Sequence, residues 1–227
     1  DIHKPSRIEC AEPGGIIILL SLIPSFTLLY LGGFLNGDSI GAVLTIVMTG
    51  GVGLLDDIVN LRQRQKVVLA IIAGLPLALS YSGSTIVKLP TIGDIELGQI
   101  LYMLFIPFAV AVASNLTNML AGFNGLEAGF GSIACGMLGL VCLLSSSWDA
   151  ALLSFVSLGA LLAFLVYNWY PARTFPGDTG TLMFGAIVAS VSILGKLEFV
   201  GASILMPAIL DFVLKMAHRD PFSQRRI

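Results

Sequence analysis

Charged residues are scarce in this chain, and their scarcity narrows the class of protein. Asp, Glu, Lys and Arg together make up 11% of the 227 positions, against 56% for hydrophobic residues, and the mean hydropathy is +0.92. Soluble domains carry about 25% charged residues, because their surface must be hydrated. So few charges cannot cover a water-facing surface of this size. A soluble globular protein is therefore excluded, and lipid is the expected solvent.

The chain has only three cysteines and carries no net positive charge. Cys10, Cys135 and Cys142 show neither metal-ligand spacing nor a disulfide framework. Cys135 and Cys142 lie inside an apolar run, where we expect them to serve packing. The net charge of −2 gives no reason to expect a nucleic-acid partner. Residue 1 is Asp rather than Met, so we expect residues 1–227 to be a single membrane-embedded domain that is trimmed at both ends.

Long apolar stretches are plentiful. A chain in lipid must pair its backbone groups internally, in helices or in a closed barrel. Barrel strands alternate apolar and polar residues, whereas Ile16–Phe34 and Ala150–Tyr167 are apolar on most sides and about as long as a spanning helix. We therefore predict an all-α polytopic transmembrane helical bundle. Its eight helices are expected over residues 16–35, 39–55, 67–82, 99–117, 125–146, 150–168, 180–195 and 199–216.

The loops between these segments predict the orientation in the membrane. Ten of the twelve basic residues fall on one side, and only Lys88 and Lys196 fall on the other. Positive loops stay in the cytoplasm, so residues 1–15, 56–66, 118–124, 169–179 and 217–227 are expected to be cytoplasmic. The longest outer loop has a β-branched run at Thr85–Val87, then Pro90, a Gly93-Asp94 turn signal and Ile95–Leu97. It predicts a short β-hairpin.

Two polar patches on the expected cytoplasmic side are suited to chemistry. Asp56 and Asp57 end a membrane helix, and Lys66 follows within reach of a diphosphate. Adjacent carboxylates repel each other and are costly to desolvate; they act either as a base and a metal or phosphate partner, or as an interfacial pair resting in water. The second patch, NLTNMLAGFNGLEAG from Asn115 to Gly129, embeds amides and glycines in apolar flanks. Glycine there allows a backbone to approach a ligand closely.

Two further patches lie on the same side. In Tyr170–Thr181 the sequence GDTG places Asp178 just before a new helix. That carboxylate suits Mg²⁺ and the helix N-terminus suits a phosphate, unless the segment is only a turn with a helix cap. The N-terminal patch, with His3, Lys4 and Glu12, is either part of a site or a charged tail. All four patches fall on one predicted face, which favours one shared site there.

With these motifs in view, the chain resembles the polyprenyl-phosphate N-acetylhexosamine-1-phosphate transferases. The resemblance covers nearly the whole chain and is greatest to the dolichyl branch of the family. It rests on GLLDDIVNLRQRQK, NLTNMLAGFNGLEAG, NWYPARTFPGDT and the D-x-x-K start that leads to Glu12. Family members have ten transmembrane helices, which implies that two lie outside this chain. The last cytoplasmic loop of the family contacts the donor sugar, and here only AHRDPFSQRRI remains of it.

The resemblance also implies roles for particular residues. It implies catalytic roles for Asp56, Asp57 and Lys66, and it makes Asn118 and Asp178 ligands of Mg²⁺, with Mn²⁺ as the alternative. It implies substrate contacts for Ile2, Glu12, Asn60, Gly122, Asn124 and Phe175, with Phe175 stacking on uracil.

The expected reaction is transfer of GlcNAc-1-phosphate from UDP-GlcNAc to a dolichyl or other polyprenyl phosphate, with UMP leaving, as the first step of lipid-linked oligosaccharide assembly. The expected partners are those two substrates and the bilayer, with a homodimer left open. Two alternatives remain: the same transfer of another N-acetylhexosamine for a cell-envelope polysaccharide, and a membrane transporter. A transporter is expected to show inverted repeats and polar residues near mid-membrane, and the sequence shows neither.

Overall fold

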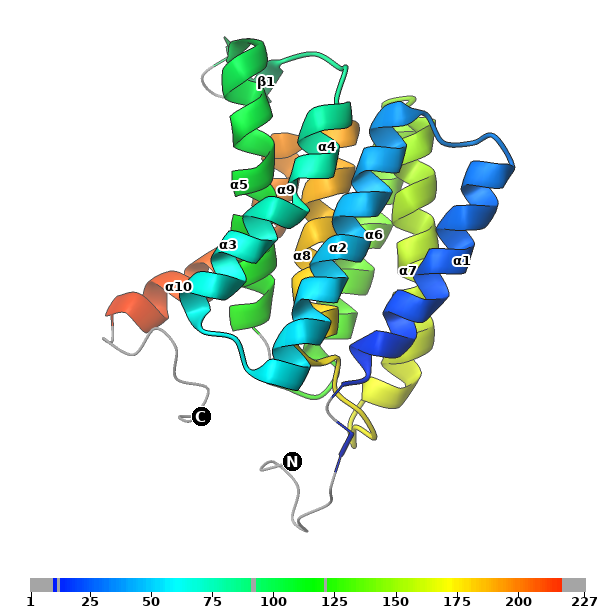
Figure 1. Cartoon of the computed structure of the whole chain (residues 1–227), viewed down its shortest axis with the longest axis vertical. Helices are drawn as coiled ribbons and strands as arrows, with labels where there is room; N and C mark the ends of the chain where they lie inside the picture. The colour runs from blue at the N-terminus through cyan, green and yellow to red at the C-terminus, as the bar shows by residue number, and fades with distance from the viewer. Residues whose placement is uncertain (1–9, 12, 91–92, 121, 218–227) are drawn as a thin grey trace.

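The computed structural model describes residues 10–11, 13–90, 93–120 and 122–217, and helices dominate this part of the chain (Figure 1). The helices are α1 (Gly15–Leu31), α2 (Gly37–Val59), α3 (Gln63–Ala73), α4 (Leu75–Ser80), α5 (Gly98–Met119), α6 (Leu126–Leu144), α7 (Trp148–Asn168), α8 (Gly177–Leu194), α9 (Glu198–Ile204) and α10 (Met206–Ala217). Two strands, β1 (Ile86–Leu89) and β2 (Gly93–Glu96), form an antiparallel pair.

Within the described residues, five helices are long and apolar enough to cross a membrane: α2, α5, α6, α7 and α8. Helices α9 and α10 make a sixth if the pair, which is bent by 56°, is one broken span. Helix α1 is apolar but has only 17 residues. The predicted polytopic helical bundle is confirmed. Each of the eight predicted segments corresponds to a helix or to a pair of consecutive helices.

Two segments predicted as single helices are each broken in two. Residues 67–82 divide at Gly74 into α3 and α4, and residues 199–216 divide at Leu205 into α9 and α10. Each break lies two residues before a proline, Pro76 or Pro207, which lacks a backbone N–H and clashes with the preceding turn. Pro24 and Pro107 lie inside the continuous α1 and α5, so proline permits a break without requiring one.

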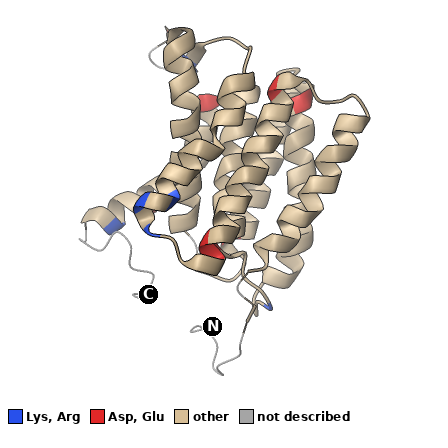
Figure 2. Ribbon diagram, in the orientation of Figure 1, with Lys and Arg blue, Asp and Glu red and all other residues tan. Residues whose placement is uncertain are grey.

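The connections alternate between the two ends of the bundle, as the apolar segments predicted. The hairpin lies at one end, and the loops after α2, α5 and α7 lie at the other (Figure 1). Most of the positions that charged residues occupy along the ribbon lie toward the two ends of the bundle (Figure 2). The predicted hairpin is confirmed, but Gly93 and Asp94 belong to β2, and Leu89 pairs with Gly93. The turn therefore lies earlier in the chain than predicted.

Helix α8 lies at the centre, with 15 of its 18 residues buried. It packs against α1, α2, α5, α6, α7 and α9. Close approach needs glycine: a Cβ at Gly53 would lie 2.2 Å from the carbonyl oxygen of Asp178, and one at Gly185 would lie 2.4 Å from Ala113. Helices α2 and α5 can thus press against α8, which brings their polar ends to its N-terminus.

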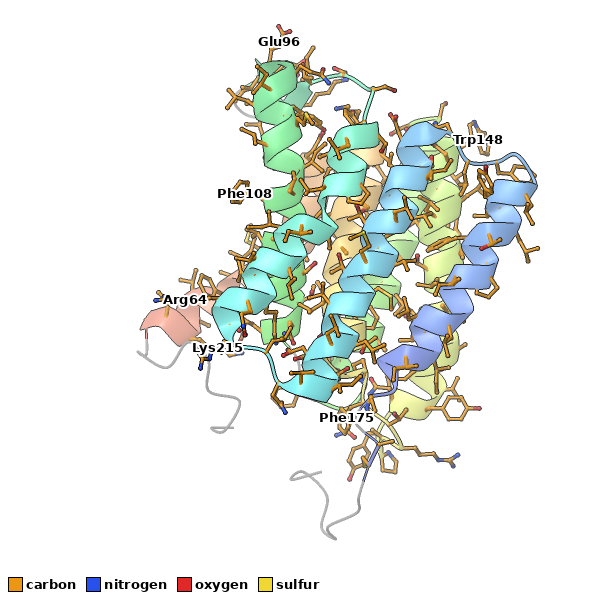
Figure 3. All side chains as sticks on the ribbon, in the orientation of Figure 1. Arg64, Glu96, Phe108, Trp148, Phe175 and Lys215 are labelled. Atoms are coloured by element: carbon orange, nitrogen blue, oxygen red, sulfur yellow. The ribbon has the colours of Figure 1, made fainter. Side chains whose placement is uncertain are left out.

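The outer faces of the helices are apolar. Leu144 is 86% exposed and Ile100 is 78% exposed, and the side chain of Phe108 points away from the bundle (Figure 3). Such residues suit contact with lipid tails. Cys135 and Cys142 are buried and free of disulfides, so the packing role predicted for them is confirmed.

Candidate active site

A lysine held between two aspartates forms the centre of the candidate site. The Nζ of Lys66 lies 2.9 Å from Oδ2 of Asp178 and forms a second ion pair with Oδ2 of Asp56. Lys66 is 8% exposed and Asp56 is 4% exposed, whereas the side chain of Asp178 is 29% exposed. Two carboxylates so close would repel each other without the ammonium group. The cluster keeps one net negative charge, and its open side is at Asp178.

The turn after α2 brings Lys66 back to Asp56. Asn60 adopts the left-handed conformation (φ 54°) and ends α2, its N–H donating to the carbonyl of Asp56 over 2.8 Å. The N–H of Leu61 then donates to Oδ1 of Asp56 over 2.6 Å. The chain can therefore reverse into α3, on which Lys66 lies one turn from the start. Asn60 has a backbone role here, and its predicted contact with substrate stays a prediction.

Asp57 caps helix α8 from outside that helix. Its Oδ1 accepts from the N–H of Asp178 (2.7 Å), and its Oδ2 accepts from the N–H and the hydroxyl of Thr179 (3.0 and 2.5 Å). The first N–H groups of a helix have no partner within it and carry partial positive charge, so a carboxylate stabilises them. These are the groups that the sequence offered to a phosphate. The structure gives them to Asp57 instead, and the interpretation of this N-terminus as a phosphate site is wrong for Asp178 and Thr179.

Asn118, on the last turn of α5, completes the cluster. With its amide oriented to satisfy its neighbours, the nitrogen donates to Oδ1 of Asp178 (2.8 Å) and to the hydroxyl of Thr181 (3.0 Å), and the oxygen accepts from Nζ of Lys66 (3.1 Å). Four predicted residues from four helices therefore meet at one point: Asp56 of α2, Lys66 of α3, Asn118 of α5 and Asp178 of α8.

The donor atoms fit a magnesium ion. Rotating the amide of Asn118 would put its oxygen 2.8 Å from Oδ1 of Asp178, close to the separation of about 3 Å between neighbouring ligands in octahedral Mg²⁺ coordination. Among the described residues, no group of three or more His, Cys, Asp or Glu side chains is arranged to hold a metal ion. Mg²⁺ commonly uses only one or two carboxylates together with substrate phosphates, so a site built on Asp178 and Asn118 satisfies its requirements.

Two loops beside the cluster carry the residues predicted to bind the nucleotide. Gly122 adopts φ +129°, and its N–H donates to Oε1 of the buried Glu127 over 2.6 Å. Oδ1 of Asn124 accepts from the N–H of Ala172 over 2.9 Å, so this oxygen joins the two loops. The N–H of Phe175 donates to the carbonyl of Ala11 over 2.9 Å, which places the start of the described chain along the second loop.

Ile2 and Glu12, the remaining predicted contacts, lie outside the described residues. Several residues with structural roles at the site were not singled out in the sequence. Thr179 and Thr181 belong to the GDTGT motif and could have been found as hydroxyls flanking a carboxylate. Glu127 is the acidic residue of the motif NLTNMLAGFNGLEAG and could have been found as a carboxylate among apolar residues. Asn168, the last residue of α7, is the first residue of the motif NWYPARTFPGDT, but nothing in that motif predicts its contact with Gly125.

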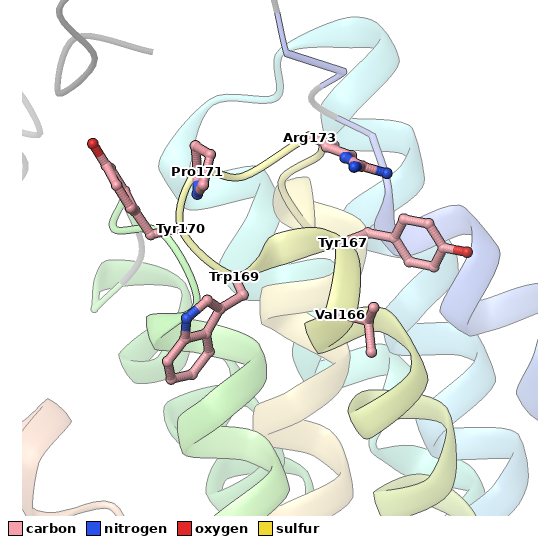
Figure 4. A pocket seen from close by; sticks show the side chains of 6 residues that line it. All are labelled: Val166, Tyr167, Trp169, Tyr170, Pro171 and Arg173. Atoms are coloured by element: carbon pink, nitrogen blue, oxygen red, sulfur yellow. The ribbon is translucent and has the colours of Figure 1, made fainter.

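A shallow hollow of about 380 Å³ lies at the same end of α7 (Figure 4). It is lined by Val166, Tyr167, Trp169, Tyr170, Pro171 and Arg173. None of the predicted site residues lines it. Exposed aromatic residues with an arginine are typical of the membrane–water interface, and we interpret the hollow as part of that surface.

Comparison with known proteins gives the family. A provisionally named UDP-N-acetylglucosamine–dolichyl-phosphate N-acetylglucosaminephosphotransferase from Saccharolobus solfataricus is 36% identical over 219 residues, which cover 95% of this chain and 68% of the relative. A protein of the same provisional name from Sulfolobus acidocaldarius is 34% identical, over 96% of this chain and 69% of the relative.

A phospho-N-acetylmuramoyl-pentapeptide-transferase from Shouchella clausii is 37% identical over 82% of this chain and 61% of the relative. The chain thus spans about two thirds of the length of these relatives. Residues 39–196, which include the four residues of the Lys66 cluster, match the family described as glycosyl transferase family 4. The chain belongs to glycosyl transferase family 4.

Proposed function

We propose that this protein transfers GlcNAc-1-phosphate from UDP-GlcNAc to a membrane polyprenyl phosphate of the dolichyl type, with release of UMP. The observation that carries the proposal is the cluster of Lys66 with Asp56, Asp178 and Asn118 at one end of an apolar helical bundle. A soluble donor and a lipid acceptor can meet only at a membrane surface. The names of the two archaeal relatives agree with this reaction.

Asp178 and Asn118 would hold Mg²⁺. When bound, this ion would offset the negative charge on the diphosphate oxygens during phosphoryl transfer. Mg²⁺ remains part of the proposal, and Mn²⁺ satisfies the same oxygen donors. Asp57 touches no reacting atom in the proposed reaction. It would fix the first turn of α8 and therefore the position of Asp178.

Lys66 would bind the donor diphosphate with the ammonium group that now lies between Asp56 and Asp178. An oxygen of the acceptor phosphate attacks the β-phosphorus of the donor, a new P–O bond forms, and the bond to the UMP oxygen breaks. Asp56 would accept the proton of a monoprotonated acceptor. Phe175, Gly122 and Asn124 would hold uridine. We also propose, from the division of basic residues, that this end of the bundle faces the cytoplasm.

The test measures UMP release from radiolabelled UDP-GlcNAc by the full-length protein, with and without dolichyl phosphate, and with Mg²⁺ or EDTA. Release should require both the acceptor and the metal. Lys66→Met should abolish it. Lys196→Met is the matched control, because Lys196 also faces a carboxylate, that of Glu198 at 3.6 Å, but lies at the opposite end of the bundle.

The outcomes separate the possible functions. UMP release from another UDP-N-acetylhexosamine, and not from UDP-GlcNAc, would leave the reaction class standing and correct the sugar, in the direction of the bacterial relative's name. Uptake of a solute into vesicles without any UMP release would overturn the proposal in favour of a transporter. We favour the transferase because most charged residues lie toward the ends of the bundle (Figure 2), whereas a transporter is expected to have polar residues near mid-membrane.

A further inference from the structure

The side chain of Asn168 connects the two loops that border the Lys66 cluster. Asn168 is the last residue of α7 and is 0% exposed. Its Oδ1 accepts from the N–H of Gly125 over 3.1 Å, and its Nδ2 donates to the carbonyl of Thr174 over 2.9 Å. A single buried amide therefore uses its acceptor on the loop between α5 and α6 and its donor on the loop between α7 and α8.

Both partners of Asn168 need this amide. Gly125 is the N-cap of α6 and adopts φ +73°; its N–H has no acceptor within the helix, because helix N-termini leave such groups unpaired. Thr174 forms an isolated parallel bridge with Ala11 in which Phe175 supplies the N–H, and its own carbonyl accepts from Nδ2 of Asn168. A buried backbone group without a partner is costly. The amide satisfies both groups at once, and only a side chain with an adjacent donor and acceptor can do so.

A further hydrogen bond joins the same two loops directly. The N–H of Ala172 donates to Oδ1 of Asn124. Together with the two bonds of Asn168, this bond connects residues 122–125 and residues 169–175 into one hydrogen-bonded unit. Helix α7 holds this unit through Asn168, and α6 holds it through Glu127, whose Oε1 accepts from the N–H of Gly122.

We propose that Asn168 is a positioning residue for nucleotide binding: its amide sets the distance between the loop carrying Gly122 and Asn124 and the loop carrying Phe175. The inference rests on the proposed function only for the identity of the ligand, a uridine nucleotide. Asn168 touches no reacting atom. It acts by holding the two walls of the nucleotide site at a fixed separation.

Three variants of the full-length protein test this proposal. Asn168→Ala removes both bonds. Asn168→Asp keeps the shape and the acceptor but turns a second lone pair toward the carbonyl of Thr174, and its O–H can donate there only when the carboxyl group is protonated. Ser154→Ala is the matched control, because Ser154 also lies buried on α7 and donates to the carbonyl of Cys135 over 2.7 Å, far from both loops.

The first readout is UMP affinity by calorimetry beside steady-state kinetics. Asn168→Ala should weaken UMP binding and raise the KM for UDP-GlcNAc by about tenfold, the effect of losing roughly one buried hydrogen bond, with kcat changed by less than about threefold. At pH 7.5, Asn168→Asp should bind UMP as weakly as Asn168→Ala does. Toward pH 5, the UMP affinity of Asn168→Asp should rise relative to that of the unsubstituted protein. Ser154→Ala should bind UMP normally at both pH values.

The second readout, hydrogen exchange of backbone amides, needs no ligand. Exchange should rise in residues 122–125 and 169–176 together in Asn168→Ala, and in neither loop in Ser154→Ala. Unchanged exchange and unchanged UMP affinity in Asn168→Ala would overturn the proposal, as would an Asn168→Asp variant whose relative affinity ignores pH. If the unsubstituted protein binds no UMP while exchange still rises in both loops, the proposed function fails and the positioning of the loops by Asn168 stands.

Discussion

The carboxylate of Asp57 gives the sharpest prediction about stability. Its two oxygens accept three hydrogen bonds from Asp178 and Thr179 at the start of α8. In Asp57→Asn, one oxygen becomes an –NH₂ group, and in either orientation that group faces an N–H that previously donated. The charge that complements the helix N-terminus is lost as well. Loss of a charged hydrogen bond, a cap and the interaction with the helix dipole together cost about 2–4 kcal/mol.

The measurement is thermal unfolding in detergent, followed by a thiol-reactive fluorophore. Cys135 and Cys142 are buried and should react only when the bundle opens. A loss of this size lowers the melting temperature by about 5–15 °C on the scale of globular domains of this length. UMP release should fall too, because Asp178 moves with the first turn of α8.

The control is Asp38→Asn at the other end of α2. Asp38 also accepts from a backbone N–H and a hydroxyl, those of Ser82, but over 3.0–3.3 Å. This change should cost less than about 1 kcal/mol and leave UMP release unaltered. Equal melting temperatures for the two variants would show that the cap on α8 contributes nothing special, and the reasoning would be wrong.

The remaining predictions concern the reaction and the topology. Asp178→Asn and Asn118→Ala should each nearly abolish UMP release while the protein stays folded, because each removes a proposed Mg²⁺ ligand; near-normal rates at saturating Mg²⁺ would remove that residue from the metal site. Phe175→Ala should raise the KM for UDP-GlcNAc by about ten- to a hundredfold, since base stacking contributes roughly 1–3 kcal/mol; an unchanged KM with a lower kcat would contradict a role in stacking. Labelling of intact cells from outside should modify Gly93→Cys and spare Gln63→Cys, and the reverse pattern would invert the proposed orientation.

The helical bundle was predictable from sequence because its solvent is lipid. An apolar stretch of about 20 residues signals a helix without any knowledge of its neighbours. The basic residues in the loops then predict on which side of the membrane each loop lies. The breaks at Gly74 and Leu205 were missed, since prolines elsewhere in the chain lie inside continuous helices. Whether a proline breaks a helix depends on packing that local sequence does not record.

The residues of the Lys66 cluster were predictable because polar side chains are costly in apolar surroundings and therefore stand out. The separate structural role of each residue was not predictable. Asp56 and Asp57 are neighbours in sequence, yet one forms an ion pair with Lys66 and the other caps a helix that begins at residue 177. The role of Asn168 was missed for the same reason: Thr174 lies in the same motif, but its other partner, Gly125, lies in a different motif and a different loop.

The central place of α8 has a consequence for how the protein is made. Chains emerge from the ribosome N-terminus first, so α1, α2, α5, α6 and α7 are all synthesised before the helix that they surround. Until α8 is made, Gly53 of α2 and Ala113 of α5 lack the helix against which they pack. Before α8 is inserted, the earlier helices cannot adopt the packing that they have in the complete bundle. A ribosome that stalled before Gly177 would leave an inserted chain in which Asp56, Lys66 and Asn118 lack the helix that assembles them.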